Sequence, residues 1–381
     1  MTTKLRAASF QDGAVTTAKI AASAITNTKI AAGAVDSDAI GSSAIVADKL
    51  GIGQIGGRRN IVINGAMQIS QRGTSFTGVT STGTYHIDRF QTNSGDSSSQ
   101  FTVTQATAGL NGFANSAKFD CTTAQSSLGT DSRVYFEHKL EGQDLQQLKK
   151  GTSDAEKVTI SFYVKSTKTG TYIVELQDYD NSRQISQAYT ISSSGTWEQK
   201  ILTFDADTTG AFDDDNAHSL SITWWLVAGS RYSSGTLSTS WTSITDANKA
   251  AGQVNLADST DNAWEITGVQ MEIGSQATPF EHRSFGEELA LCQRYYWQHL
   301  GEENSTGTAV YASAAYATSN YRASVDLPCQ MRGQPSGSIA FSDGSPSLDF
   351  ISTTAVGLYS TGTYRMRRTA GANYIKLDAE L

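Results

Sequence analysis

The sequence predicts a mainly β protein, built as a homotrimeric fibre with an N-terminal repetitive stalk, an antiparallel jelly-roll sandwich and a C-terminal β domain. Only 38% of the 381 residues are apolar and 17% are charged, with many glycines and few prolines, which is typical of sheets with polar outer faces and many turns. The other two observations are a decad repeat near the N-terminus and a series of short alternating segments after it.

The decad repeat covers residues 13–52, as GAVTTAKIAA, SAITNTKIAA, GAVDSDAIGS and SAIVADKLGI. A large apolar residue recurs every five positions, which matches neither the period of a helix nor that of a strand. Because so little apolar surface cannot offset the ordering entropy of one chain, we expect three copies to bury it around a common axis. The predicted core positions of this trimeric stalk are Val15, Ile20, Ile25, Ile30, Val35, Ile40, Ile45 and Leu50.

Two other interpretations of the repeat stay open. A flexible linker has the same richness in Ala, Ser and Thr, although a linker has no reason to keep apolar residues in register. A dimer or another oligomer would also bury the apolar row.

The pattern changes after Gly56 and Gly57, which sets the first domain boundary at residues 1–57. Alternating segments then follow, separated by clusters of Gly, Asn, Asp and Ser, and they predict a jelly-roll domain over residues 58–290. The clearest predicted strands are residues 101–104, 158–164, 172–176, 201–204 and 220–224.

One helical pattern interrupts the strands at residues 284–296. Ser284 and Glu287 have the spacing of a capping box, and Leu289, Cys292 and Tyr296 fall on one helical face. We expect this helix to lead into a C-terminal β domain, so that residues 291–381 form the third unit and the tip. Its predicted strands are residues 310–311, 321–325, 339–341 and 374–378.

Charge and cysteine content argue against several classes of protein. A net charge of −8 disfavours binding to nucleic acid and to anionic membranes. Three widely spaced cysteines fit neither a disulfide framework nor a zinc site. No apolar run suits a membrane span or a secretion signal, so we expect no membrane insertion and folding in the cytosol of the producing cell.

Several stretches resemble the tail-fibre and receptor-binding virion proteins of bacteriophages. The decad repeat is similar to the repeats of their stalks, and residues 60–65 (NIVING), 71–73 (QRG) and 85–90 (YHIDRF) resemble the opening of a lectin-like domain in that family. The most distinctive stretch is residues 268–296, with GVQMEIGSQATPFEHR and EELALCQRYY. The ending LDAEL at residues 377–381 also resembles that family.

The resemblance implies a virion protein of the tail, usually trimeric, that is assembled in the host cytoplasm. It implies attachment to tail or baseplate proteins through the N-terminal residues, and a sandwich similar to carbohydrate-binding modules that binds polysaccharide or lipopolysaccharide of the host surface. It supplies no binding residue that can be carried over position by position.

Catalytic motifs are missing, so we expect no enzyme, no catalytic residue and no cofactor. The five histidines form no metal-binding spacing, and there is no nucleophile elbow, P-loop or dinucleotide fingerprint. Glu281, His282 and Arg283 stand together, but their position before the capped helix favours a structural hydrogen-bonding corner.

An acidic loop offers weak candidates for a metal site. Asp213, Asp214 and Asp215, near Asp205 and Asp207, could bind Ca²⁺ through carboxylate oxygens. A solvated acidic loop is the simpler interpretation, and we expect no metal.

Exposed aromatic residues are the candidates for sugar binding, because a sugar ring packs its C–H face on an aromatic ring. Alternation places Trp225 on the face opposite Trp224, so Trp225 is predicted to point outward, and Trp241 lies in a Ser- and Thr-rich loop. Tyr311, Tyr316 and Tyr321 recur in the predicted tip. For each of them, packing in the core or between subunits is the alternative.

These observations favour a phage tail fibre subunit that adheres to host glycans through several weak sites at once. The alternative is a purely structural virion component, such as a head or neck fibre or a decoration protein. A depolymerase is a further alternative, disfavoured because a parallel β-helix pattern is missing from the sequence.

Overall fold

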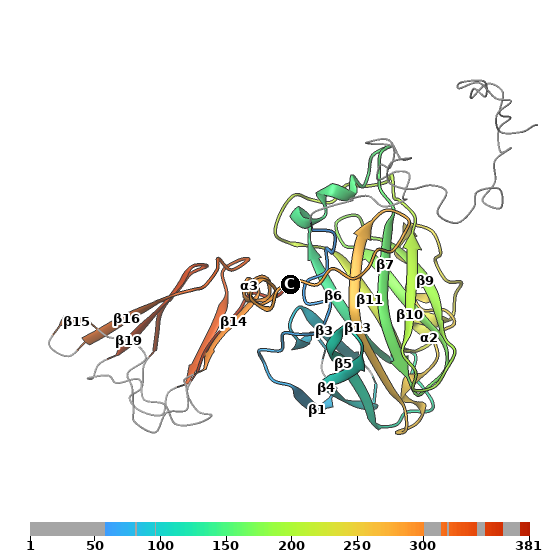
Figure 1. Ribbon diagram of the computed structural model, residues 1–381, viewed down its shortest axis with the longest axis horizontal. Helices are drawn as coiled ribbons and strands as arrows, with labels where there is room; N and C mark the ends of the chain where they lie inside the picture. Colours follow the sequence, from blue (N-terminus) through green and yellow to red (C-terminus); the bar gives the residue numbers. More distant parts are fainter. Residues whose placement is uncertain are drawn as a thin grey trace, which may run out of the picture. The chain divides into compact units, whose positions relative to one another are not determined.

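The computed structural model describes residues 58–80, 82–95, 97–300, 314–317, 320–340, 347–360 and 374–381 (Figure 1). The chain divides into two compact units, residues 1–50 and 51–381, and every described residue belongs to the second unit. The predicted stalk with its core positions Val15 to Leu50 lies outside the described residues, so the trimeric stalk stays a prediction.

Most of the second unit is built from two antiparallel sheets. One sheet has the order β1 (Ser75–Val79), β4 (Gln100–Leu110), β5 (Phe113–Thr123), β13 (Ala263–Ile273), β7 (Val158–Ser166) and β10 (Glu198–Phe204). The other has the order β12 (Thr242–Ser243), β9 (Arg183–Ile191), β8 (Gly170–Asp178), β11 (His218–Ala228), β6 (Arg133–Glu141), β3 (Phe90–Gly95) and β2 (Thr84–Ile87).

The mainly β fold with antiparallel sheets is confirmed, and two such sheets suit a jelly roll. Each of the five predicted strands up to residue 224 lies inside an observed strand, namely β4, β7, β8, β10 and β11. The pairing is long-range, since β13 lies between β5 and β7. Short helices occupy the loops of the sandwich: η4 (Gly142–Asp144), η5 (Gln146–Leu148), α2 (Ser230–Ser233), η6 (Asp246–Asn248) and η7 (Leu256–Asp258).

The two sheets share one apolar core. Phe119 of β5 lies 5.2 Å from Phe136 of β6, measured between ring centroids, and Phe162 of β7 lies 5.9 Å from Trp224 of β11. Each pair joins one sheet to the other, so the alternate residues of both sheets interdigitate as in a sandwich.

Helix α3 (Phe285–Gln293) follows the sandwich and begins at the predicted capping box. The Ser284 hydroxyl accepts a hydrogen bond from the backbone N–H of Glu287, and the Glu287 carboxylate accepts one from the N–H of Ser284. The prediction that Tyr296 continues the helix is wrong. Tyr296 begins strand β14 because it pairs with Asp378 of a C-terminal strand.

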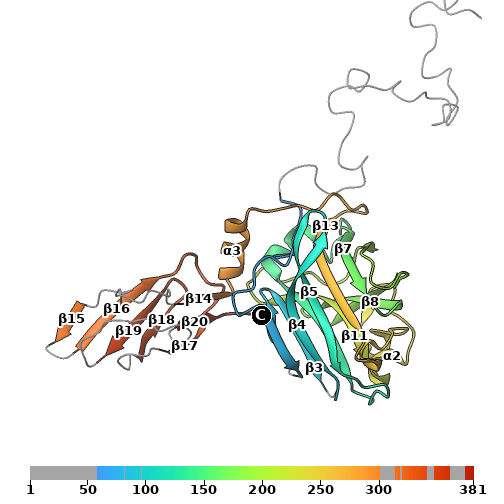
Figure 2. The ribbon, with the colours of Figure 1, turned by 60° about the horizontal axis from the view of Figure 1, so that its bottom comes forward.

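Two smaller sheets follow α3 (Figure 2). One has the order β14 (Tyr296–Leu300), β20 (Tyr374–Asp378) and β17 (Ser336–Ala340), and the other β15 (Ala314–Ala317), β16 (Asn320–Asp326), β19 (Ala355–Ser360) and β18 (Ser347–Ile351). The predicted strands at 321–325 and 374–378 lie in β16 and β20, and residue 341, the end of the third, lies outside the described residues.

The segments that carry the family resemblance meet at one junction. The buried Arg89 pairs with Glu380, and its guanidinium lies 3.3 Å above the ring of Tyr295. Arg72 reaches Asp378 at 3.0 Å. Residues of the motifs at 71–73, 85–90, 287–296 and 377–381 therefore meet where the sandwich joins the C-terminal strands.

Candidate functional site

The candidate site lies on the face of the seven-stranded sheet that points away from the core. Thr223 of β11 pairs with Glu137 of β6 on one side and with Glu175 of β8 on the other. Since Trp224 is part of the core, its neighbour Thr223 and both paired glutamates project from the opposite face. Three neighbouring strands thus present a row of carboxylate, hydroxyl and carboxylate.

A long loop over residues 229–250 covers one side of this row. The N–H of Ser186 in β9 donates to the carbonyl of Ser238, and the N–H of Ala250 donates to the carbonyl of Tyr232. These bonds place the loop over the sheet and bring Tyr232 and Lys249 beside Glu175.

The uncovered part of the face is a pocket of about 240 Å³. Its lining combines aromatic rings, amides, carboxylates and cations: Arg133, Tyr135, Glu137, Glu175, Gln177, Tyr179, Thr223, Trp225, Arg231, Tyr232, Asp246 and Lys249. A lining with hydrogen-bond donors, acceptors and aromatic faces is able to bind a small hydroxyl-rich molecule.

Tyr179 supplies the exposed aromatic surface of the pocket. Its side chain is 45% exposed, and its ring lies 4.0 Å from the ring of His218. Burial lowers the pKa of His218 to about 3, with a smaller contribution from Lys139, so the imidazole that supports Tyr179 is neutral at ordinary pH.

The two glutamates form the floor and differ in their hydrogen bonds. Glu137 accepts a hydrogen bond from Ser221 at 2.6 Å. Glu175 accepts one from the indole N–H of Trp225 at 2.9 Å through Oε2, whereas its Oε1 has no hydrogen-bond partner and lies 3.7 Å from the ammonium of Lys249. Burial raises the pKa of both carboxyls. An unsatisfied buried oxygen is costly, but Glu175 is only 2% exposed, so a ligand has to reach the bottom of the pocket to donate a hydrogen bond to it.

The cations of the pocket are tied to neighbours that hold them in position. Lys249 donates to the amide oxygen of Gln177 at 2.8 Å, and Arg231 pairs with Asp246 at 2.9 Å. The guanidinium of Arg133 donates to the Tyr232 hydroxyl at 3.2 Å. With these charges in balance, the pocket suits a neutral polar ligand better than a strongly charged one.

Of the two predicted tryptophans, which are the predicted sugar-binding residues whose side chains the structure describes, Trp225 lines this pocket. It lies on the face opposite Trp224, as alternation predicts, but the prediction that it is exposed is wrong. Only 2% of its side chain is exposed, because Tyr232, Ala250 and their loop pack over it. Trp225 therefore holds Glu175 in place through its indole hydrogen bond, and its ring has no exposed face on which a sugar could stack.

The other predicted site residues lie elsewhere. Trp241 is half-buried, donates its indole N–H to the carbonyl of Asp205 at 2.8 Å and does not line the pocket. Tyr316 and Tyr321 belong to β15 and β16, and Tyr311 lies outside the described residues. Their part in ligand binding stays a prediction.

The acidic loop gains no support as a metal site. Asp213, Asp214 and Asp215 are exposed, and Asp215 accepts a hydrogen bond from the N–H of Ala217 at 2.8 Å. Nowhere in the described ranges do three or more His, Cys, Asp or Glu side chains gather as metal ligands would. Nearby Asp207 is buried and paired with Lys150 and Arg183.

The corner at Glu281 and Arg283 has the structural role expected from the sequence. The Glu281 carboxylate accepts hydrogen bonds from the N–H groups of Arg59 and Asn60, each at 2.7 Å. Arg283 donates to the carbonyl of Val62 at 3.0 Å and to Glu288 at 3.1 Å.

The sequence interpretation missed Tyr179, Glu137 and Glu175. A signal exists for Glu175, a charged residue within the apolar run of residues 172–176, but not for Glu137, whose strand also carries Arg133, His138, Lys139 and Glu141. Tyr179 stands in a turn between Asp178 and Asp180, and only the fold brings it over the sheet.

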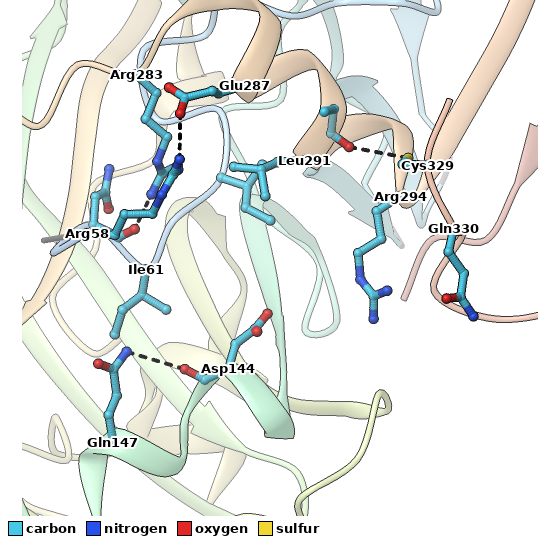
Figure 3. A pocket seen from close by; sticks show the side chains of 13 residues that line it. Arg58, Ile61, Asp144, Gln147, Arg283, Glu287, Leu291, Arg294, Cys329 and Gln330 are labelled. Carbon is cyan, nitrogen blue, oxygen red and sulfur yellow. Dashed lines mark hydrogen bonds and ion pairs between the residues drawn. The ribbon is translucent and has the colours of Figure 1, made fainter. Parts of the chain in front are cut away.

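A second, larger hollow of about 580 Å³ lies beside helix α3 (Figure 3). Its cations are already paired, Arg58 with Glu287 at 2.8 Å and Arg294 with Glu141 at 2.8 Å. The rest of the lining combines apolar side chains, among them Ile61 and Leu291, with polar ones such as Asp144, Gln147 and Gln330. This hollow has no unsatisfied acceptor comparable to Glu175.

Among the described helices, none is both long and apolar enough for a membrane span. No protein-family model matches the chain, and no curated protein does.

Solved structures do resemble the chain. One is the enzymatically active domain of tailspike protein 4 of Bacteriophage CBA120, with 14% identity, a TM-score of 0.27, and coverage of 56% of this chain and 21% of that chain. Another is CBM4, with 13% identity, a TM-score of 0.29 and coverage of 55% and 97%.

A third is the family 11 carbohydrate-binding module from Clostridium thermocellum in complex with a β-1,3-1,4-mixed-linked tetrasaccharide, with 12% identity, a TM-score of 0.27 and coverage of 54% and 98%. The chain spans about a fifth of the tailspike chain and nearly all of the two modules. At these identities and TM-scores the likeness does not identify a site in this chain.

Proposed function

We propose that this chain is a non-enzymatic subunit of a phage-type tail fibre that adheres to host-surface glycans through the pocket at Tyr179. The observation that carries the proposal is one exposed aromatic ring beside a row of fixed polar groups. Tyr179 is 45% exposed, and the buried Glu175, which lines the same pocket, has an oxygen without a hydrogen-bond partner.

This combination matches the chemistry of a sugar ring. One face of a pyranose is lined with C–H groups and packs on an aromatic ring, while its hydroxyls both donate and accept hydrogen bonds. Lys249 and Gln177 are partly exposed polar groups of the lining, while Glu175, Glu137 and Thr223 form a buried floor at 2%, 3% and 4% exposed. The volume of about 240 Å³ suits one sugar residue or part of two, so a longer chain would continue outside the pocket.

The fibre part of the proposal is supported by the sequence. The apolar residue at every fifth position favours a stalk of three chains, and the resemblance of the motifs favours a virion protein attached to tail or baseplate proteins through residues 1–57. A pocket of this size binds a single sugar weakly, and three linked copies raise the effective concentration at a polysaccharide surface. Host polysaccharide or lipopolysaccharide is the proposed ligand.

The experiment is a binding measurement between the purified full chain and a panel of bacterial surface polysaccharides. We expect saturable binding to at least one of them, competed by its own soluble oligosaccharide. An absence of binding to every polysaccharide and to intact host cells would favour the structural virion component. Release of reducing ends from a bound polysaccharide would contradict the non-enzymatic part of the proposal.

A further inference from the structure

We infer that copies of this chain contact one another at the corner before helix α3, where Phe285 of one copy inserts into the α3 hollow of the next. The α3 hollow is the cavity of about 580 Å³ whose apolar wall includes Ile61, Ala290 and Leu291. The inference rests on the self-association in the proposed function and adds to it the surface that makes the contact.

The corner before helix α3, at residues 281–287, lies beside the end of the predicted stalk. Arg58 is the first described residue after the repeats, and its guanidinium pairs with Glu287 at 2.8 Å. The next two backbone N–H groups, of Arg59 and Asn60, donate to Glu281 at 2.7 Å each. If three chains share an axis up to residue 57, then three copies of this corner lie close to that axis.

Phe285, the first residue of helix α3, is exposed. At 61% exposed it has the largest exposed fraction among the large apolar side chains of the described residues. The capping box of Ser284 and Glu287 fixes the first turn of α3 and so holds the ring outward. An apolar ring held in solvent beside an assembly axis is typical of a contact surface.

The α3 hollow would receive the Phe285 ring. Figure 3 shows Leu291 and Ile61 bordering the α3 hollow, with Arg58 and Glu287 joined to each other at its edge. Asp144, Gln147 and Gln330 also line the hollow, and the apolar wall of Ile61, Ala290 and Leu291 is the part that would gain from an apolar partner. An aromatic side chain would remove that wall from water.

The Phe285 ring and the α3 hollow lie on different faces of helix α3. Ala290 lies five residues after Phe285, which at 3.6 residues per turn places it about 140° around the helix. A Phe285 ring therefore does not fill its own hollow. A protruding group and a receiving surface on different faces of the same chain are what a closed ring of identical copies requires.

A cross-linking experiment tests this contact, because the native Cys329 lines the α3 hollow. The variant Phe285→Cys is treated with a short bis-maleimide and run on a denaturing gel. We expect covalent dimers and trimers, since the new thiol of one copy lies next to Cys329 of its neighbour. The double variant Phe285→Cys/Cys329→Ser should give only monomer.

Ile201→Cys is the matched control, because Ile201 is also an exposed apolar residue, at 52%, on strand β10. It should give no more cross-linked species than the wild type. Light scattering of the wild type separates the two proposals. A trimeric wild type without cross-linking at Phe285→Cys, or with equal cross-linking at Ile201→Cys, overturns the contact alone. A monomeric wild type overturns the trimer and the contact together.

Discussion

In the proposed pocket, Tyr179 would make the apolar contact with a sugar and Glu175 the polar contact. The ring of Tyr179 is held at the rim by the neutral His218, and the carboxylate of Glu175 is held at the floor by Trp225. Neither side chain has to be reordered when a ligand arrives, which lowers the entropic cost of binding.

Replacing Glu175 by Gln tests the free acceptor. The amide oxygen still accepts from Trp225, while the amide nitrogen takes the place of the unpartnered Oε1, so an acceptor becomes a donor. We expect glycan affinity to fall about 10-fold, equivalent to about 1.4 kcal/mol. Isothermal titration with the bound oligosaccharide checks this, and unchanged affinity would remove Glu175 from the contact.

His86 makes stability depend on pH. The side chain is 4% exposed, and burial, followed by the charge of Arg72, lowers its pKa to about 4. In the unfolded chain the pKa is near 6.5, so the unfolded state takes up a proton first as the pH falls. The contribution of His86 is complete above pH 6.5 and is lost between pH 6.5 and 4, up to about 3 kcal/mol.

Urea unfolding of the wild type and His86→Gln over this range measures that contribution. The wild type should lose more free energy of unfolding than the variant between pH 6.5 and 4. Above pH 6.5 the difference between the two proteins should stay constant, which serves as the internal control. Parallel curves over the whole range would contradict the assignment to His86.

Sequence alternation identified the direction of Trp225 but not its burial. Direction depends on neighbouring residues in one strand, and Trp224 and Trp225 do point to opposite faces. Exposure depends on what covers the face, here residues 229–250, whose bonds to Ser186 are long-range. No local pattern in the sequence predicts that residues 229–250 pack over Trp225.

At the scale of elements, the strands of the sandwich were predictable and their order was not. Residues 158–164 alternate clearly and form part of β7. The position of β13 between β5 and β7 depends on pairing over more than a hundred residues, as for Ile266 with Ala117. Strand β11 is buried on both faces because the core covers one and a loop the other.

Helix α3 could be predicted at its start because a capping box is a local pattern. Its end could not, because Tyr296 continues the helical periodicity and yet pairs with Asp378 in a sheet. The pairing of Tyr296 with Asp378 makes this position a strand, and Asp378 is 82 residues away in the sequence.

Two neighbouring substitutions test the start of α3 with opposite signs. Ser284→Ala removes the cap and should lower the free energy of unfolding by about 1 kcal/mol. Gly286→Ala should raise it by about 0.5 to 1 kcal/mol, because a Cβ there would meet no atom within 4 Å and alanine favours a helix. Thermal or urea unfolding of the full chain checks both, and equal signs for the two variants would contradict the capping account.

At the scale of the whole molecule, the family motifs and the proposed binding site are separate. The motifs build the junction of Arg89, Arg72 and Glu380, which joins distant parts of the chain. The pocket uses Tyr179, Glu137 and Glu175, which belong to none of those motifs. If the chain has the proposed function, a shared junction with a different pocket would let proteins of one architecture bind different glycans.

In the proposed function, assembly determines how strongly the molecule adheres. One pocket of about 240 Å³ would bind weakly, and several copies joined by the proposed stalk would convert this into firm attachment to a repetitive polysaccharide. Changes in the pocket should therefore be amplified at a surface compared with a single site in solution.

The most direct test of the central claim compares Tyr179→Ala with Phe350→Ala in binding of the full chain to a polysaccharide-coated surface. The two side chains are almost equally exposed, at 45% and 46%, but only Tyr179 lines the pocket. We predict at least a 10-fold loss of affinity for Tyr179→Ala, about 1.4 kcal/mol or more, and no change for Phe350→Ala. Equal affinity of the two variants and the wild type would contradict it.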